Sequence, residues 1–347
     1  MIDKKTVFVL GAGASCPYGY PSGTRLRERV CLSQGFWQDY NARGIVDQIM
    51  DPTEKIRRLP EIKEFMEVFN KSMIKSIDKF MANNPKLAKI GKHIIAFEVL
   101  RAEGKSLFGE EAKLEKDTLA YAQNTPIGLL SKTLFQGDEW YSFLYNRLIE
   151  GQNGPNTFPD FSNGNLAFIT FNYDRSLEQF LYEALHNSFT EVQEDEIVKS
   201  LKQLRILHVY GQVAFLKWQN PKDYIDYKLP ISELLLQRVS KNIRTIYEQK
   251  ESPELNEARQ LLAQAERIFF LGFGYAQENM EVLKLPDRTK RATEIYGTAF
   301  GLEPKEKLDV REKIKEWLPA EFLDQVNIGY LMGSKNMDCL ELLRNYW

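Results

Sequence analysis

Cysteine is scarce in this sequence. Only three of its 347 residues are cysteines, namely Cys16, Cys31 and Cys339, and they lie far apart. A zinc ribbon uses paired CxxC motifs, and a disulfide framework uses an even set of cysteines at short spacings; neither pattern is present. The sequence therefore predicts no metal site and no disulfide framework.

Excess charge and long apolar runs are lacking as well. The formal net charge is −2, which gives no bulk electrostatic reason to expect direct binding of nucleic acid. No apolar run is long enough to cross a bilayer, and the charged residues at 3–5 lead straight into a strand pattern rather than a signal peptide. With 43% hydrophobic and 27% charged residues, we expect a cytoplasmic globular protein of one large or two modest domains, without membrane contact.

The most informative stretch runs from Thr6 to Gly23. Its apolar run 7–10 predicts a buried parallel strand, which a glycine-rich turn, Gly11-Ala12-Gly13-Ala14-Ser15, follows directly. Such a turn lets backbone N–H groups approach a phosphate at the start of the next helix. The dinucleotide-binding fingerprint is incomplete, because Cys16 stands in place of its third glycine and no strand ending in an acidic residue follows. A tight strand–helix turn without a ligand is the alternative.

Further predicted strands end in glycine, asparagine or aspartate. The expected strand 166–171 is followed by Asn172 and Asp174, and the strand 267–271 by Gly272 and Gly274. Other strands are expected at 205–213, 293–298 and 325–331, and a last helix at 337–346. Strands that alternate with helices predict an α/β fold with a doubly wound, mostly parallel sheet. Ligands bind at the carboxyl edge of such sheets, although Asp174 alone is also typical of a helix cap.

The segment from Trp37 to Gly151 has a helical and charged pattern. Apolar residues recur at three- and four-residue steps along 62–77, including Phe65, Phe69 and Met73, and predict one amphipathic helix. Two more helices are expected at 86–101 and 140–149, with His93 packed in the core. We therefore expect a helical insertion at 37–151 and a sheet domain formed by residues 1–36 and 152–347.

Four short blocks follow one another along the chain: GAGAS with PSG at 11–23, TFNYD at 170–174, VYG at 209–211 and LGFG at 271–274. In content and order they resemble the sirtuin-like NAD hydrolases of bacterial anti-phage defence systems, over most of the chain. The tripeptide Ser-Ile-Asp at 76–78 and the pair Trp140-Tyr141 resemble landmarks of that family's helical insertion. The resemblance implies a Rossmann-like sirtuin sheet, NAD as substrate, and cleavage of the bond between nicotinamide and ribose.

The resemblance also assigns residues to the substrate. Backbone N–H groups of the glycine-rich turn would hold phosphate, Asn172 would hold ribose hydroxyls or the attacking water, and Asp174 would hold the nicotinamide carboxamide. Gly272 and Gly274 would let the chain approach the adenosine ribose. The NAD-binding positions implied in this way are Gly11, Ala12, Gly13, Ser15, Pro21, Ser22, Thr170, Gly211, Gly272, Gly274 and, more weakly, Asn279.

One position departs from the family's pattern. The family has a catalytic histidine directly before the glycine of the third block, where this chain has Tyr210. His208 lies two residues earlier, and on a strand two such residues point to the same face. His208 is therefore a candidate general base, and Tyr210 a candidate for orienting the ribose. The alternative is a core histidine beside a packed tyrosine.

The scarcity of cysteine also bears on the reaction. Protein-deacylating sirtuins carry paired CxxC motifs, so the absence of such pairs favours hydrolysis of NAD by water to nicotinamide and ADP-ribose, without zinc. A non-catalytic sensor of NAD or ADP-ribose, or a structural subunit of a defence complex, is the alternative function. Because no sensor segment is expected after the last helix, we expect control through a homo-oligomer or a separately encoded partner. The resemblance suggests a HerA-type ATPase as that partner.

Overall fold

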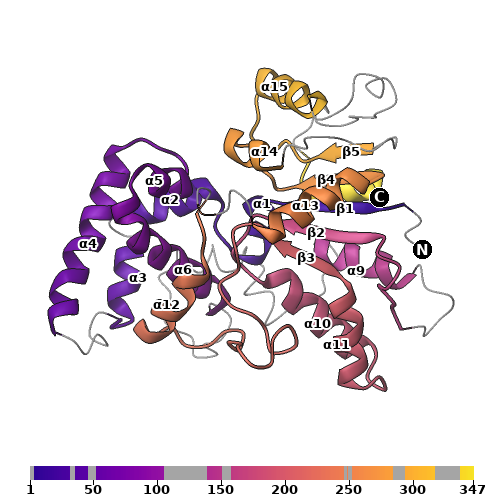
Figure 1. Cartoon of the computed structure of the whole chain (residues 1–347), viewed down its shortest axis with the longest axis horizontal. Helices are drawn as coiled ribbons and strands as arrows, with labels where there is room; N and C mark the ends of the chain where they lie inside the picture. Colours follow the sequence, from indigo (N-terminus) through magenta and orange to yellow (C-terminus); the bar gives the residue numbers. More distant parts are fainter. Residues whose placement is uncertain are drawn as a thin grey trace, which may run out of the picture.

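A five-stranded parallel β-sheet forms the centre of the computed structural model (Figure 1). The structure describes residues 4–31, 36–45, 52–104, 139–150, 158–245, 248, 252–283, 294–316 and 337–347. The strand order is β3-β2-β1-β4-β5, which confirms the predicted α/β fold with a parallel sheet. The strands are β1 (Thr6–Leu10), β2 (Leu166–Thr170), β3 (Arg205–His208), β4 (Arg267–Leu271) and β5 (Glu294–Gly297).

Four of these strands end at the same level. Leu10 pairs with Thr170 on one side and with Leu271 on the other, and Thr170 pairs with His208. β1, β2 and β4 are almost completely buried, because each is a continuous apolar run covered on both faces. The segments that leave β1, β2, β3 and β4 therefore meet at one edge of the sheet.

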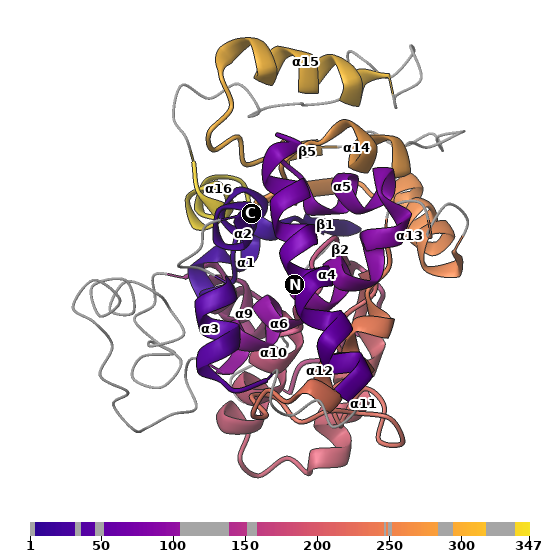
Figure 2. The same ribbon diagram turned by 90° about the vertical axis from the view of Figure 1, so that its left-hand side faces the viewer.

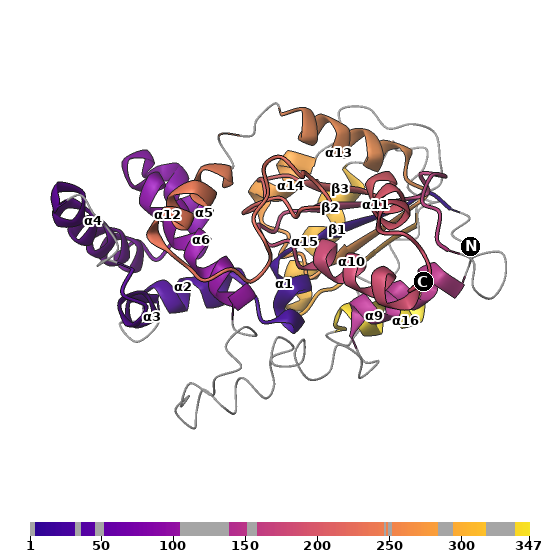
Figure 3. The same ribbon diagram turned by 90° about the horizontal axis from the view of Figure 1, so that it is seen from below.

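Helices cover both faces of the sheet (Figure 3). On one face Phe8 stacks between Phe168 and Phe269, with ring centroids 5.2 Å apart. The helices of this face are α9 (Trp140–Glu150), α10 (Ser176–Ser188) and α16 (Cys339–Tyr346). Those of the other face are α13 (Pro253–Gln264), α14 (Gln277–Leu283) and α15 (Pro304–Lys315). The strand order reverses beside β1, whose neighbours are β2 and β4.

A second set of helices, here called the helical group, lies beyond the carboxyl edge of the sheet (Figures 1 and 2). It consists of α2 (Gly23–Cys31), α3 (Phe36–Ala42), α4 (Pro52–Lys71), α5 (Ile77–Asn83), α6 (Ala88–Gly104) and α12 (Glu233–Val239). α3, α4, α5 and α12 all contact α6, which is buried along most of its length. α6 is therefore the centre of the helical group.

The membership of the helical group differs from the predicted range 37–151. α9 lies within that range but packs against α10 and α16 at the sheet, whereas α12 comes from later in the chain and packs against α6. Tertiary packing thus joins segments that are far apart in the sequence. The other described elements are α1 (Ala12–Ser15), η1 (Cys16–Tyr18), η3 (Pro85–Leu87), α11 (Glu194–Gln203) and η4 (Ser240–Asn242).

Two predicted elements are wrong in extent. The apolar pattern along 62–77 is split between two helices, because α4 ends at Lys71 and α5 begins at Ile77. Met73 lies between them with a φ of 57° and is 78% exposed, and the Ser76 side chain caps α5. The predicted strand 205–213 ends early, at residue 208, because Gly211, with a φ of 79°, turns the chain.

Other predicted elements are present. The helices predicted at 86–101, 140–149 and 337–346 are found as α6, α9 and α16, and the strand predicted at 293–298 is found as β5. His93 is buried, as predicted. The strand predicted at 325–331 lies outside the described residues. No helix within the described ranges is long and apolar enough to span a membrane.

Candidate active site

The glycine-rich turn after β1 packs backbone against backbone on the turn after β4. The Gly13 N–H donates to the Gly272 carbonyl at 2.9 Å, and the Gly11 N–H donates to the Leu271 carbonyl at 3.0 Å. A Cβ on Gly11 would lie 2.6 Å from the Gly272 oxygen, and a Cβ on Gly272, whose φ is 56°, would lie 1.9 Å from the Ala14 nitrogen. Side chains are therefore excluded here. Two of the N–H groups predicted to hold phosphate are already hydrogen-bonded within the protein.

Asn172 joins the turn after β1 to the loop after β2. Its Nδ2 donates to the Gly11 carbonyl and to the Ser15 hydroxyl, both at 2.9 Å, and its backbone N–H donates to Thr170 Oγ1 at 3.0 Å. Because both amide hydrogens are used, these bonds fix the orientation of the side-chain amide. Among the described residues no donor reaches Asn172 Oδ1, so this oxygen is available to accept a hydrogen bond from a ligand.

Asp174 is held by serine side chains from two elements. Both the backbone N–H and the hydroxyl of Ser176 donate to Asp174 Oδ1. The Ser15 hydroxyl is a second side-chain partner of Asp174. Burial raises the pKa of Asp174 above its usual range, although the hydrogen bonds from Ser176 and Ser15 act in the opposite direction. Since Asn172 donates to Ser15, one hydroxyl connects the two side chains that the resemblance assigns to the substrate.

Helix α9 adds Trp140 and Tyr141 to this hydrogen-bonded cluster. Trp140 Nε1 donates to the Ala14 carbonyl at 2.8 Å, and the Tyr141 hydroxyl lies 2.8 Å from Ser176 Oγ. Tyr141 also stacks on Tyr18, with ring centroids 3.7 Å apart. The structure therefore places these two residues, which resemble landmarks of the insertion, against the turn after β1 and the start of α10.

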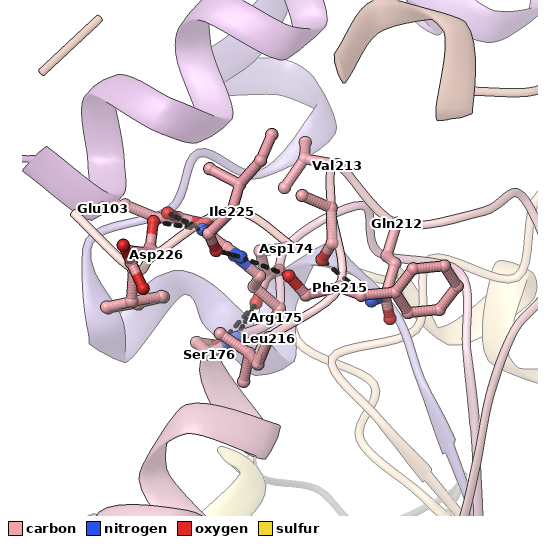
Figure 4. Close-up of polar contacts among 12 residues, drawn as sticks. Glu103, Asp174, Arg175, Ser176, Gln212, Val213, Phe215, Leu216, Ile225 and Asp226 are labelled. Carbon is pink, nitrogen blue, oxygen red and sulfur yellow. Dashed lines mark hydrogen bonds and ion pairs between the residues drawn. The ribbon is translucent and has the colours of Figure 1, made fainter. Parts of the chain in front are cut away.

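Arg175, which follows Asp174, anchors the loop after β2 (Figure 4). Its guanidinium forms a bidentate ion pair with Glu103 of α6, with both N–O distances at 3.1 Å. The side chains of Arg175 and Glu103 are 0% and 1% exposed. The same guanidinium donates to the carbonyls of Phe215, Ile225 and Asp226. Arg175 thus connects the loop after β2 to the helical group and to the segment 215–226.

His208 and Tyr210 lie on opposite faces of the sheet, so the prediction of a shared face is wrong. His208 Nδ1 lies 2.9 Å from the Asn172 carbonyl oxygen, and its Nε2 lies 2.6 Å from Glu178 Oε1 of α10. Tyr210 belongs to the apolar cluster of the other face, where its hydroxyl donates to Asn279 Oδ1 at 2.8 Å. The alternation of side chains stops before Tyr210 because β3 ends at His208.

The surroundings of His208 favour its charged form. Burial lowers the pKa of His208, but the charge of Glu178, the hydrogen bond to it and the Asn172 carbonyl outweigh burial, so the net shift is upward. In an imidazolium both ring nitrogens are donors, which matches the two acceptors present. Such a group has no nitrogen left to take a proton from water. The geometry therefore assigns His208 to holding the backbone of Asn172.

The His208–Glu178 pair is expected to make stability depend on pH. Because the folded-state pKa of His208 is raised, its contribution is fully present below the unfolded value of about 6.5 and is lost as the pH rises through the folded value. Urea denaturation of the wild type and His208→Gln at several pH values measures this contribution. We expect the stability gap to be largest near pH 6 and to shrink at alkaline pH. A gap independent of pH would contradict a charged His208.

A second hydrogen-bonded cluster links the sheet edge to the helical group. The Tyr173 hydroxyl donates to Asp78 Oδ1 of α5 at 2.6 Å and lies 3.2 Å from the Arg244 carbonyl oxygen. The Arg244 N–H donates to the Tyr210 carbonyl at 3.0 Å. Burial raises the pKa of Asp78, although the hydrogen bond from Tyr173 lowers it. The tripeptide 76–78 thus supplies a helix cap and a half-buried carboxyl group at the site.

The remaining predicted NAD-binding positions lie around this edge in different settings. Ser22, which follows Pro21, accepts a backbone N–H from the first turn of α2, as an N-cap residue does. Gly211 packs so closely on Asn242 that a Cβ would lie 2.1 Å from the Asn242 oxygen. Gly274 is exposed and has open space where a Cβ would lie. Close packing explains why position 211 is a glycine, whereas nothing in the structure requires glycine at position 274.

Two acidic residues of the site were difficult to predict from the sequence. Glu103 lies 72 positions before Arg175, and no local pattern links the two residues. Glu178 carries a weak signal, because an acidic residue in the first turn of the helix after Asp174 is expected near the sheet edge. Its pairing with His208 depends on how α10 packs against the sheet, which the sequence pattern did not show.

Comparisons with known proteins assign no family to this chain. No protein-family model matches it, and no curated protein matches it. In the part of the chain that the structure describes, no group of three or more histidine, cysteine or acidic residues is placed to hold a metal ion.

Proposed function

We propose that this protein is an NAD hydrolase that cleaves the bond between nicotinamide and ribose to give nicotinamide and ADP-ribose. In this proposal it resembles the sirtuin-like enzymes that deplete cellular NAD in anti-phage defence. The observation that carries it is the fixed amide of Asn172, whose Oδ1 is available at the meeting point of the chains that leave β1 and β2. The strand order indicates a ligand site at the same place, because open α/β sheets bind ligands where the strand order reverses.

The residues at this edge suit a neutral leaving group. Nicotinamide leaves NAD without a net charge, so the reaction needs no strong general acid, in contrast to ordinary glycoside hydrolysis. Asn172 Oδ1 accepts a hydrogen bond from a ribose hydroxyl or from the attacking water, and Asp174 takes the nicotinamide carboxamide. His208 acts as a positioning residue, because it and Glu178 hold the Asn172 backbone.

NAD binding at this edge requires a local opening of the protein. Asn172 and Asp174 are only 8% and 7% exposed, and the Tyr173–Asp78 hydrogen bond connects the loop after β2 to α5. The pyrophosphate also needs donors other than the N–H groups of the first two glycines of the turn, which bond to the β4 segment. We infer that the helical group moves relative to the sheet edge when NAD enters.

A non-catalytic sensor of NAD or ADP-ribose, or a structural subunit of a defence complex, is the second candidate function. The state of the histidines favours this second function. The chain has only three of them. His208 has both ring nitrogens engaged, His93 is buried in the helical group, and His186 is exposed near the end of α10. The site therefore has no histidine free to act as a general base.

Incubation of the purified protein with NAD distinguishes these functions. Chromatography that detects free nicotinamide, together with mass spectrometry of the other product, measures both the cleavage and the linear or cyclic form of ADP-ribose. Release of nicotinamide supports the hydrolase. NAD binding without release supports the sensor, and neither binding nor release supports the structural subunit.

We further propose that the active form is a homo-oligomer controlled by a separately encoded partner, with a HerA-type ATPase as the candidate. An enzyme that drains NAD unconditionally would be toxic to its cell. Phe65 and Phe69 are buried and cannot form contacts between copies, whereas Met73, Leu234 and Phe300 are exposed. Light scattering is expected to show more than one chain per particle. A monomer that cleaves NAD at full rate without a partner would contradict this proposal.

A further inference from the structure

The helical group contains a cavity of about 580 Å³. Its walls come from α4, η3, α6, α12 and η4, and from Glu248, so none of the residues at the candidate active site lines it. Small-molecule pockets in proteins typically have volumes of about 300–1,000 Å³. The cavity is therefore large enough for a metabolite, at a place that the NAD proposal does not use.

Basic side chains dominate the wall of this cavity. Arg58, Lys89, Lys92 and Lys241 line it, and Glu248 is its one acidic lining residue among those described. Lys92 pairs with Glu248 at 2.7 Å. Lys89 and Lys241 are exposed, and within the described ranges neither has a carboxylate at ion-pair distance. In the part of the chain that the structure describes, these two cationic groups therefore face the cavity without an ion-pair partner.

The inner wall of the cavity is fixed by buried hydrogen bonds. Arg58 pairs with Glu233 of α12 at 3.3 Å, and His93 Nε2 lies 3.0 Å from the Tyr40 hydroxyl. Burial and the positive charges of Arg58 and Lys89 lower the pKa of His93 to about 3, so this ring is neutral at physiological pH. Arg58 is thus paired with a buried carboxylate behind the wall, and the neutral His93 adds no charge to it.

We propose that this cavity binds a small molecule that carries two or more phosphate groups. Clustered lysine and arginine side chains form strong charge-assisted hydrogen bonds with phosphate oxygens, and several such side chains match several negative charges. No Phe, Tyr or Trp is among the described lining residues, so recognition rests on the phosphates rather than on stacking of a base. The partly enclosed shape favours a small molecule over a nucleic-acid strand.

The occupant also orders the segment 240–244. Ser240 and Lys241 line the cavity, and the residues that follow reach the loop after β3. Asn242 Nδ2 donates to the Val213 carbonyl at 2.9 Å, and the Arg244 N–H donates to a carbonyl in that loop. A ligand held by Lys241 therefore restrains a segment that is bonded to the sheet edge.

Titration calorimetry with inorganic tripolyphosphate as the probe tests the site. We expect one saturable site in the wild type, affinity reduced about tenfold or more in the Lys89→Glu/Lys241→Glu double variant, and unchanged affinity in the control Lys202→Glu, which replaces an exposed lysine of α11. Because the substituted lysines are exposed, the variants are expected to fold, which their melting temperatures check. Equal affinity in the wild type and the double variant would overturn the proposal.

Two further measurements separate this site from the proposed NAD site. Saturating nicotinamide riboside, which carries the nicotinamide and ribose of NAD but no phosphate, is expected to leave tripolyphosphate binding unchanged, whereas competition would place the probe at the sheet edge and overturn the proposal. Hydrogen–deuterium exchange of residues 240–244 is expected to slow when tripolyphosphate binds. Binding without slower exchange would overturn the ordering of this segment. Neither result depends on whether the protein cleaves NAD.

Discussion

Replacement of Asn172 by alanine is expected to lower the rate of NAD cleavage about 100- to 1,000-fold, because loss of one group that positions the reacting centre typically has this effect. The variant loses the oriented Oδ1 and both hydrogen bonds of Nδ2, to the Gly11 carbonyl and the Ser15 hydroxyl. Circular dichroism is expected to show a retained fold, since the sheet itself is unchanged. Nicotinamide release under single-turnover conditions measures the effect.

Two companion variants sharpen this test. Asn172→Asp keeps the size of the side chain but places a carboxylate oxygen against the Gly11 carbonyl, so we expect a comparable loss of activity. Asn187→Ala removes an exposed asparagine on α10 whose Nδ2 donates to a backbone carbonyl of the same helix, and we expect turnover within about twofold of the wild type. Wild-type turnover in Asn172→Ala would remove Asn172 from the mechanism.

Replacement of Arg175 by methionine is expected to destabilise the protein by about 3–5 kcal/mol, the usual effect of breaking a buried ion pair on one side. Glu103 would remain buried without its partner, and burial already raises the pKa of Glu103 against the opposing charge of Arg175. Three backbone carbonyls would also lose a donor. The midpoint and slope of urea denaturation, followed by circular dichroism, measure the change in the free energy of unfolding.

The matched control is Arg238→Met. Arg238 pairs with Asp223 at the surface, where the two side chains are 53% and 70% exposed, so we expect a loss of less than about 1 kcal/mol. A double variant, Arg175→Met with Glu103→Met, is expected to be more stable than Arg175→Met alone, because it leaves no unpaired buried charge. Equal effects of Arg175→Met and Arg238→Met would show that the buried pair does not hold the loop after β2.

The sheet was determined by local features of the sequence. The apolar runs that became β1, β2 and β4 are buried on both faces, so their pattern alone identifies them as central parallel strands. Glycine at positions 11, 13 and 272 marks a close backbone approach, which the structure shows between the turns after β1 and β4. The common level of the strand ends then brings Asn172 to that approach, because the carboxyl ends of neighbouring parallel strands meet at one edge of the sheet.

Tertiary structure decided which side chains complete the site. The periodicity of a helix shows that one face is buried but not what that face contacts, so the pairing of Glu103 with Arg175 had no sequence signal. The side that Tyr210 faces depended on the end of β3, which is set by the turn at Gly211 and its contact with Asn242. Strand alternation applies only as far as the strand continues.

The helical group shows the same division between sequence and structure. The apolar pattern of the sequence predicted helices where α4, α6 and α9 lie, because this signal acts within a few residues. Only packing decided that α9 covers the sheet while α12 joins α6 and brings Glu233 to Arg58 and His93. Such contacts depend on the burial of apolar faces shared by distant segments, and this is a property of the folded chain rather than of any one stretch of sequence.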